Sequence, residues 1–216
     1  MIIEFVGESG CGKTTLAKKV FPNIEGARKK GSLTTKDNLK SVIRILASKK
    51  TRRLFCTYFI MEIAENGFSR LIRNTLHLAG LMNIMLIDNE KEDAWIIDQG
   101  MIQFIQTVYF NKSPKNNRYI KIIKMITENC VYCVVACHCD YKTLCDRIEM
   151  RKHSQDKIVR RIEFADQKLV ELHEKNLRMI MKHIPESNYI VVDTASDVEM
   201  NTKEVCEFIC SRRRSS

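Results

Sequence analysis

The chain has 216 residues, of which 44% are hydrophobic and 29% are charged, and its formal net charge is +10. This length and composition are typical of one globular domain with a substantial hydrophobic core, and they exclude a disordered chain. No run of 18 apolar residues occurs, so the sequence predicts no membrane span, and nine scattered cysteines favour a reducing, cytoplasmic location.

The positive charge is unevenly spread along the chain. Between Arg28 and Arg53 there are ten basic residues and one acidic residue, Asp37. A block of this kind raises the local concentration of anions such as phosphorylated substrates or nucleic acid. A solvated helix face is the alternative interpretation, and the sequence leaves both open.

The N-terminal part begins with a buried strand and continues with helices. Residues 2–6 (IIEFV) are β-branched and aromatic, which predicts a strand. The basic, glycine-containing stretch 23–35 is expected to be loop. Apolar residues at three- and four-residue spacing predict helices around it. These predicted helices cover residues 13–20, 39–46, 52–65 and 68–83.

The second half of the chain alternates between strands and helices. Short apolar runs predict strands at 94–98, 131–137 and 189–193. The helices predicted between and after them cover residues 101–110, 117–129, 141–151 and 158–172, and one more carries Val198, Val205, Phe208 and Ile209. The arginines of the C-terminal tail are expected to be frayed. Buried strands separated by helices indicate a mostly parallel sheet with helices on both faces, so we predict a single three-layer α/β/α domain over residues 1–216.

The segment Gly7–Thr14 (GESGCGKT) fits the phosphate-loop pattern G-x-x-x-x-G-K-[ST] at every position. It lies between a predicted strand and a predicted helix, where glycines allow backbone N–H groups to form an anion site beside the positive end of the helix. Lys13 is expected to reach the β- and γ-phosphates of ATP, and the Thr14 hydroxyl to bind Mg²⁺. The predicted nucleotide-binding residues are Gly7, Glu8, Ser9, Gly10, Cys11, Gly12, Lys13, Thr14 and Thr15.

Asp98 ends the predicted strand AWIID, where a phosphate-loop protein needs an acidic partner for Mg²⁺. Two roles are open to this carboxylate: ligation of Mg²⁺, directly or through water, and acceptance of the proton of an attacking hydroxyl. A third interpretation, an aspartate that only caps the following turn, also fits the sequence.

The amino-acid sequence of the loop also resembles that of ATP-binding-cassette transporter subunits. That family requires a Ser-Gly-Gly-Gln type signature upstream of the second strand motif and a glutamate after the aspartate, and here Gln99 follows Asp98. A Ras-like GTPase would have an Asn-Lys-x-Asp motif after a strand. The sequence has neither signature, which excludes both families.

The remaining layout resembles the small P-loop kinases, the group of thymidylate kinases and deoxynucleoside kinases. The loop is at the N-terminus, a helical stretch of about 36–90 corresponds to the acceptor region, and an arginine-containing segment of about 147–161 (within DRIEMRKHSQDKIVRR) corresponds to a lid. The resemblance implies that lid arginines clamp the transferring phosphoryl group. Arg147 and Arg151, on one helix face at i,i+4 spacing, are the first candidates, and Arg160 and Arg161 the second.

The resemblance implies Mg²⁺-dependent phosphoryl transfer from ATP to a small-molecule acceptor that is nucleoside- or nucleotide-like, with Lys13, Asp98, Arg147 and Arg151 as catalytic residues. The sequence departs from the family at Gln99, where an arginine is expected. Gln99 cannot neutralise a phosphate, so a neutral hydroxyl-bearing acceptor becomes more plausible than a nucleotide. The alternatives are an ATPase that acts as a switch or on nucleic acid, and a kinase-like protein that binds nucleotide without catalysis.

Two cysteine patterns invite other interpretations. Cys11 lies near a helix N-terminus and Lys13, conditions that lower the pKa of a thiol, so we expect oxidation at Cys11 to interfere with nucleotide binding. The patterns Cys130-x-x-Cys133 and Cys137-His138-Cys139 invite a zinc interpretation. Alternation along a strand puts Cys133 and Cys137 on one face and Cys130 on the other, so four ligands could not converge on one ion. Buried free thiols are the better interpretation.

Overall fold

The computed structural model describes most of the chain outside residues 60–93 and the segment before residue 167. The described residues are 1–29, 35–47, 49, 51–53, 55–56, 59, 79–82, 94–98, 100–108, 118–129, 131–153 and 167–214. Of the predicted helices at 52–65 and 68–83, only short helical pieces fall in these ranges, at 51–53, 55–56, 59 and 79–82. Within the described ranges, no helix combines the length and the hydropathy needed to cross a membrane.

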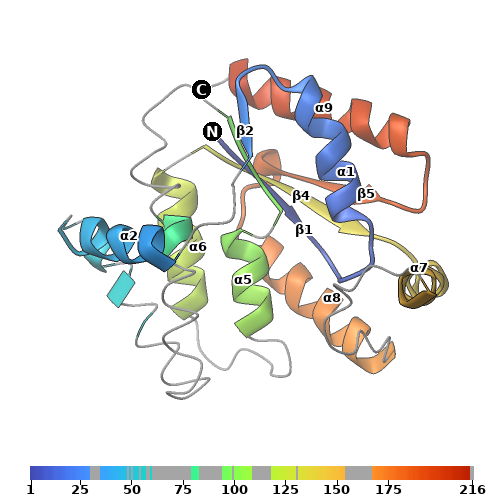
Figure 1. The fold of residues 1–216 in the computed structure, drawn as a ribbon, viewed down its shortest axis with the longest axis horizontal. Helices are drawn as coiled ribbons and strands as arrows, with labels where there is room; N and C mark the ends of the chain where they lie inside the picture. The colour runs from blue at the N-terminus through green and yellow to red at the C-terminus, as the bar shows by residue number, and fades with distance from the viewer. Residues whose placement is uncertain are drawn as a thin grey trace.

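Five parallel strands form one sheet at the centre of the molecule (Figure 1). Their order is β2-β3-β1-β4-β5. The strands are β1 (Ile2–Val6), β2 (Ala27–Lys29), β3 (Ala94–Ile97), β4 (Tyr132–His138) and β5 (Tyr189–Asp193). The predicted α/β class with a parallel sheet is confirmed.

Helices cover both faces of the sheet, which gives three layers (Figure 1). Helices α1 and α9 lie on one face, and α5, α6 and α8 lie on the other. The described helices are α1 (Lys13–Val20), α2 (Thr35–Ala47), α5 (Met101–Val108), α6 (Arg118–Asn129), α7 (Tyr141–His153), α8 (Gln167–Met181) and α9 (Val198–Arg214), with 3₁₀ turns η1 (Phe21–Asn23) and η3 (Glu186–Asn188).

The central strand β1 explains why two hydrophobic cores form. All five of its residues are buried, and successive side chains point to opposite faces. Ile2 and Val6 belong to the core beneath α5, α6 and α8. Ile3 and Phe5 belong to the core beneath α1 and α9. Because β1 is buried on both faces, its sequence is an almost continuous apolar run, and this run is the signal that predicted the strand.

Several predicted boundaries were wrong. The predicted loop 23–35 contains β2, a three-residue basic strand that pairs with β3 through its backbone and carries no apolar alternation. Helix α8 continues to Met181, beyond the predicted end at 172. The arginines expected to be frayed, Arg212 to Arg214, form the last turn of α9, where basic side chains complement the negative helix end.

Glu4 is a carboxylate buried in the middle of β1, with 0% of its surface exposed. It accepts hydrogen bonds from the N–H groups of Ile102 (3.0 Å) and Gln103 (2.7 Å) in the first turn of α5, and from the Tyr132 hydroxyl. Burial is the main cause that raises the pKa of Glu4 from 4.5 to about 6, and these hydrogen bonds oppose it. Glu4 therefore fixes the start of α5 against the sheet.

We predict a pH-dependent contribution of Glu4 to stability. Because its pKa is higher in the folded chain, Glu4 stabilises the fold most below pH 4.5 and loses that contribution as the pH rises through about 6. The loss is about 2 kcal/mol. Chemical denaturation of the parent and of Glu4→Gln, from about pH 4 to about pH 7, isolates the effect because glutamine does not titrate. A free-energy difference between the two that stays constant or changes in the opposite direction would contradict this prediction.

Candidate functional site

The glycine-rich loop runs from Gly7 to Gly12 and connects β1 to α1, as predicted. Gly7 (φ 148°) and Gly12 (φ 96°) have backbone conformations that side chains other than glycine rarely adopt. A Cβ on Gly7 would lie 2.3 Å from the Cys137 carbonyl oxygen of β4, so the loop passes directly against the neighbouring strand. Left-handed glycines of this kind shape the concave anion sites of phosphate loops.

Helix α1 begins at Lys13, immediately after the loop, so its positive end faces the loop. The Lys13 ammonium donates to the Glu8 carbonyl oxygen at 3.1 Å. Ser9 and Thr15 are both exposed. Thr15 lines a cleft that also borders Gly10 and Gly12. Of the predicted nucleotide-binding residues, Ser9, Thr14 and Thr15 are exposed, whereas Gly7, Gly10 and Cys11 are buried.

Thr14 and Asp98 meet across the sheet, although 84 positions separate them in the sequence. The parallel register of β1 and β3, in which Glu4 pairs with Ile97, brings the residue after β3 beside the loop. Thr14 Oγ1 lies 2.9 Å from Asp98 Oδ2 and 3.1 Å from Oδ1. Strand β3 ends at Ile97, so Asp98 lies just beyond the strand that was expected to include it.

These oxygen donors fit Mg²⁺, which prefers hard oxygen ligands and usually takes one or two from the protein and the rest from phosphates and water. Within the part of the chain that the structure describes, no group of three or more His, Cys, Asp or Glu side chains is arranged to hold a metal. A metal shared with a bound phosphate chain needs no such group. The alternative of a zinc site that includes Cys130 concerns a residue outside the described ranges.

Arg147 lies between the loop and the turn that follows β5. Its guanidinium donates to the Cys11 carbonyl oxygen at 2.9 Å, to the Thr194 carbonyl oxygen at 2.6 Å and to Thr194 Oγ1 at 3.2 Å. Arg147 therefore contacts the loop through the carbonyl oxygen of Cys11. Its predicted role, to clamp the transferring phosphoryl group, stays a prediction. Arg151 belongs to the same helix, α7, and its side chain lies outside the described residues. Gln99, Arg160 and Arg161 also lie outside them.

A cleft of about 560 Å³ opens beside Arg147. Its walls include Gly12, Thr15, Arg147, Thr194 and Ser196, so it lies between the loop and the turn after β5. That turn is held in place because Thr194 N–H donates to the His138 carbonyl (2.8 Å) and the Asn201 amide donates to the Asp193 carbonyl (2.8 Å). The cleft has the size of a small-molecule site and adjoins the loop directly.

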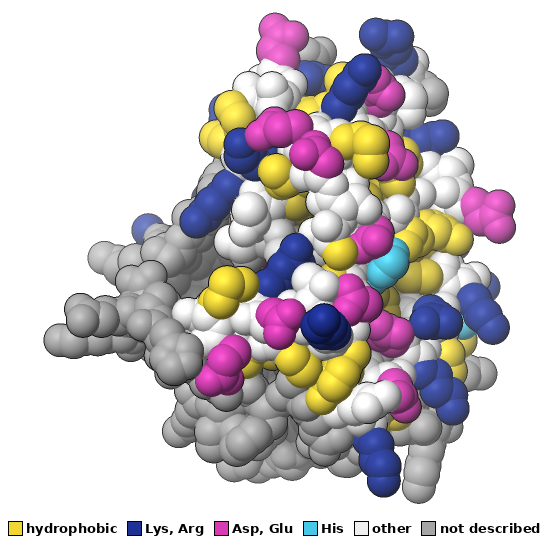
Figure 2. Space-filling model, turned by 90° about the vertical axis from the view of Figure 1, so that its right-hand side faces the viewer, with side chains coloured by type: hydrophobic (Ala, Val, Ile, Leu, Met, Phe, Trp, Pro, Cys, Tyr) yellow, Lys and Arg dark blue, Asp and Glu magenta, His cyan; other side chains and the backbone are white. Residues whose placement is uncertain are grey.

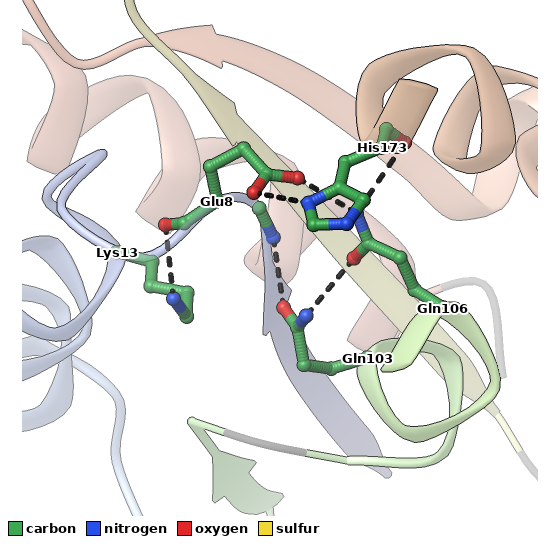
Figure 3. Close-up of polar contacts among 6 residues, drawn as sticks. Glu8, Lys13, Gln103, Gln106 and His173 are labelled. Carbon is green, nitrogen blue, oxygen red and sulfur yellow. Dashed lines mark hydrogen bonds and ion pairs between the residues drawn. The ribbon is translucent and has the colours of Figure 1, made fainter. Parts of the chain in front are cut away.

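Glu8 is the centre of a polar network that the sequence did not reveal (Figure 3). Its carboxylate contacts Gln106 of α5 and His173 of α8, and Gln103 of α5 accepts the N–H of Gly7 at 3.0 Å. The sequence separations are 96 to 165 residues, so no local pattern signals these contacts. Gln103, Gln106 and His173 are the residues of the site that sequence reasoning missed.

Cys11 does not have the environment that its sequence position suggested. The side chain is 1% exposed, and burial raises the pKa of the thiol, while Lys13 opposes this effect only in part. Neighbouring Cys137 is also buried, and burial raises the pKa of Cys139 to about 11. The expectation of a reactive, low-pKa thiol at Cys11 was wrong, because desolvation outweighs the nearby positive charge.

The basic block between Arg28 and Arg53 is only partly described, since the side chains of residues 29–39 lie outside the described set. On the face shown in Figure 2, basic and acidic side chains are interspersed, with apolar side chains between them. The described part of that face therefore carries mixed charge.

The fold is similar to solved structures of small P-loop kinases. Deoxyadenosine kinase from M. mycoides matches with a TM-score of 0.54 with bound dCTP (18% identity, 98% of this chain, 100% of that chain) and 0.55 with bound dATP (16%, 97% and 99%). Thymidylate kinase from Candida albicans matches with a TM-score of 0.51 (11% identity, 100% of this chain, 93% of that chain). No protein-family model matches the sequence, and no curated protein matches it.

The glycine-rich loop, the Thr14–Asp98 pair and the parallel sheet thus belong to an α/β fold that is similar to the folds of small P-loop kinases. The predicted resemblance to the deoxynucleoside and thymidylate kinase group is confirmed at the level of the fold. At identities of 11% to 18% the similarity concerns the fold alone.

We predict that Cys11 reacts slowly with thiol reagents. Cys56 and Cys210 are exposed, so iodoacetamide at pH 8 is expected to label them before Cys11, by about tenfold or more in rate because Cys11 is desolvated and its pKa is raised. Mass spectrometry of peptides taken over a time course measures the order. Labelling of Cys11 ahead of Cys56 and Cys210 would show that the loop opens far more than this structure implies.

Proposed function

We propose that the chain is a kinase that transfers the γ-phosphoryl group of ATP to a small, nucleoside-like acceptor that bears a free hydroxyl. The observation that carries the proposal is the contact between Thr14 and Asp98 directly after the glycine-rich loop. The fold shared with deoxyadenosine and thymidylate kinases supports the class of acceptor. The proposal treats residues 1–216 as one cytoplasmic domain.

Each residue of the loop region has a defined role in this proposal. The backbone of Gly7–Gly12 and the N-terminus of α1 bind the phosphate chain, because glycine conformations and the helix end favour anions there. Lys13 exchanges its contact with the Glu8 carbonyl for the β- and γ-phosphate oxygens. Positioning and charge stabilisation account for most of catalysis in phosphoryl transfer.

Thr14 and Asp98 would hold Mg²⁺, which would neutralise charge on the phosphates when bound. Asp98 is also proposed to accept the proton of an attacking hydroxyl, and its contact with Thr14 beside the loop supports this role. The cleft bordered by Arg147 and Thr194 is proposed to hold the base of ATP. Arg147 orients the wall of that cleft, and Arg151 remains a proposed contact to the transferring phosphoryl group.

The acceptor is proposed to bind on the opposite side of the loop from this cleft, against the region of about 36–90. The segment of about 147–161 is proposed to close over both substrates. A neutral acceptor is favoured over a nucleotide because Gln99 follows Asp98 where an arginine would be needed to bind a second phosphate.

We predict that ADP forms from ATP and Mg²⁺ only when an acceptor is present. A coupled assay over nucleosides, nucleotides and sugars identifies the acceptor class, and Lys13→Ala is the matched blank, with an expected rate loss of at least about a hundredfold. ADP release that DNA or RNA stimulates without an acceptor would favour the nucleic-acid ATPase. ATP binding without ADP formation from any acceptor would indicate an inactive nucleotide-binding protein.

We predict that Asp98→Asn folds and binds ATP but loses phosphoryl transfer by about 10²- to 10⁴-fold. Titration of Mg²⁺ separates the two roles of the carboxylate. A metal ligand is indicated if the variant needs more Mg²⁺ to reach its maximal rate, and a proton acceptor if only the maximal rate falls. Activity equal to that of the parent would remove Asp98 from the mechanism.

A further inference from the structure

The carboxylate of Glu8 is held from outside the loop by two helices. His173 Nδ1 of α8 donates to Glu8 Oε2 at 2.7 Å, and Gln106 Nε2 of α5 donates to Glu8 Oε1 at 3.1 Å. His173 and Gln106 are each only 2% exposed, and the Glu8 side chain is 17% exposed. Charge-assisted hydrogen bonds on both oxygens fix the position of a carboxylate.

Gln103 connects the contact between Gln106 and Glu8 to Gly7, the loop residue before Glu8 (Figure 3). Its Oε1 accepts the N–H of Gly7 at 3.0 Å, and its Nε2 donates to Gln106 Oε1 at 2.9 Å. Two consecutive loop residues are therefore tied to α5, and the second is also tied to α8. We refer to Glu8, Gln103, Gln106 and His173 as the Glu8 relay.

The inner side of Glu8 engages the residue expected to bind phosphate. The Glu8 carbonyl oxygen accepts from the Lys13 ammonium at 3.1 Å and from the N–H of Cys11 at 3.2 Å. Glu8 is therefore held at both ends: α5 and α8 bind its side chain, and the N–H of Cys11 binds its carbonyl. The oxygen that accepts from Lys13 thus belongs to a residue whose position both helices restrict.

We propose that the Glu8 relay positions the phosphate loop, and that His173 and Gln106 are positioning residues for the binding of ATP. This inference rests on the proposed function. Helix α8 is the first described helix after the segment of about 147–161. The relay thus connects the phosphate loop to α8, which follows the proposed lid, and to α5, which follows Asp98.

A purely structural role for the same residues makes a different prediction. Gln106 Nε2 also lies 3.5 Å from the His173 carbonyl oxygen, so the pair contributes to the packing of α5 against α8. If packing were the whole role, substitutions would lower stability and leave the affinity of the folded protein for ATP unchanged. Affinity measured on folded protein separates the two.

The test compares two substitutions at His173. In His173→Asn the side-chain amide replaces the Nδ1 donor, whereas His173→Leu removes it. We expect His173→Leu to weaken the binding of ATP with Mg²⁺ on the order of tenfold, and His173→Asn to stay within about threefold of the parent, as measured by calorimetry. Arg178→Ala is the matched control on α8, because Arg178 is exposed and pairs with Glu174 on the same helix.

The outcomes separate this inference from the proposed function. If the parent binds ATP and His173→Leu binds it equally well, or if His173→Asn loses as much as His173→Leu, the relay is overturned while the proposed function stands. If the parent binds no ATP, both are overturned. Should His173→Leu fail to fold, Glu8→Gln takes its place with the same expected loss, and unchanged affinity in that variant overturns the relay.

Discussion

The parallel register of the sheet is the constraint on which the site depends. Because β1, β3, β4 and β5 all run in one direction, their carboxyl ends lie at the same edge. The loop follows β1, Asp98 follows β3, and Thr194 follows β5. Backbone pairing therefore brings these three segments to one edge of the sheet, which explains why residues far apart in the sequence meet at hydrogen-bond distance.

Two carboxylates on the first strand and the loop organise the helices around that edge. Glu4 lies inside the sheet and receives the first N–H groups of α5, and Glu8 receives side chains from α5 and α8. A buried carboxylate is stable only when hydrogen bonds compensate its lost hydration. The position of α5 is therefore restricted from two sides, and α5 presents Gln103 to the loop at the point where the loop leaves β1.

Burial also decides the chemistry of the loop cysteine. A helix N-terminus and a lysine favour a thiolate, but Cys11 is packed in the core with Cys137 and Cys139. Desolvation is the larger effect, so the thiol is held in its protonated form. Gly7 passes so close to Cys137 that the loop packs directly against strand β4.

The sequence by itself determined the phosphate loop, the bounds of α1 and most strands, because glycine spacing and runs of buried apolar residues are local signals. It also indicated Asp98 from its place at a strand end. Only the tertiary structure decided that Thr14 contacts Asp98, that Arg147 bonds to the backbone of Cys11 and Thr194, and that β2 joins the sheet. The Glu8 relay depends on packing between residues up to 165 positions apart, and no short-range pattern of hydrophobicity or propensity carries that information.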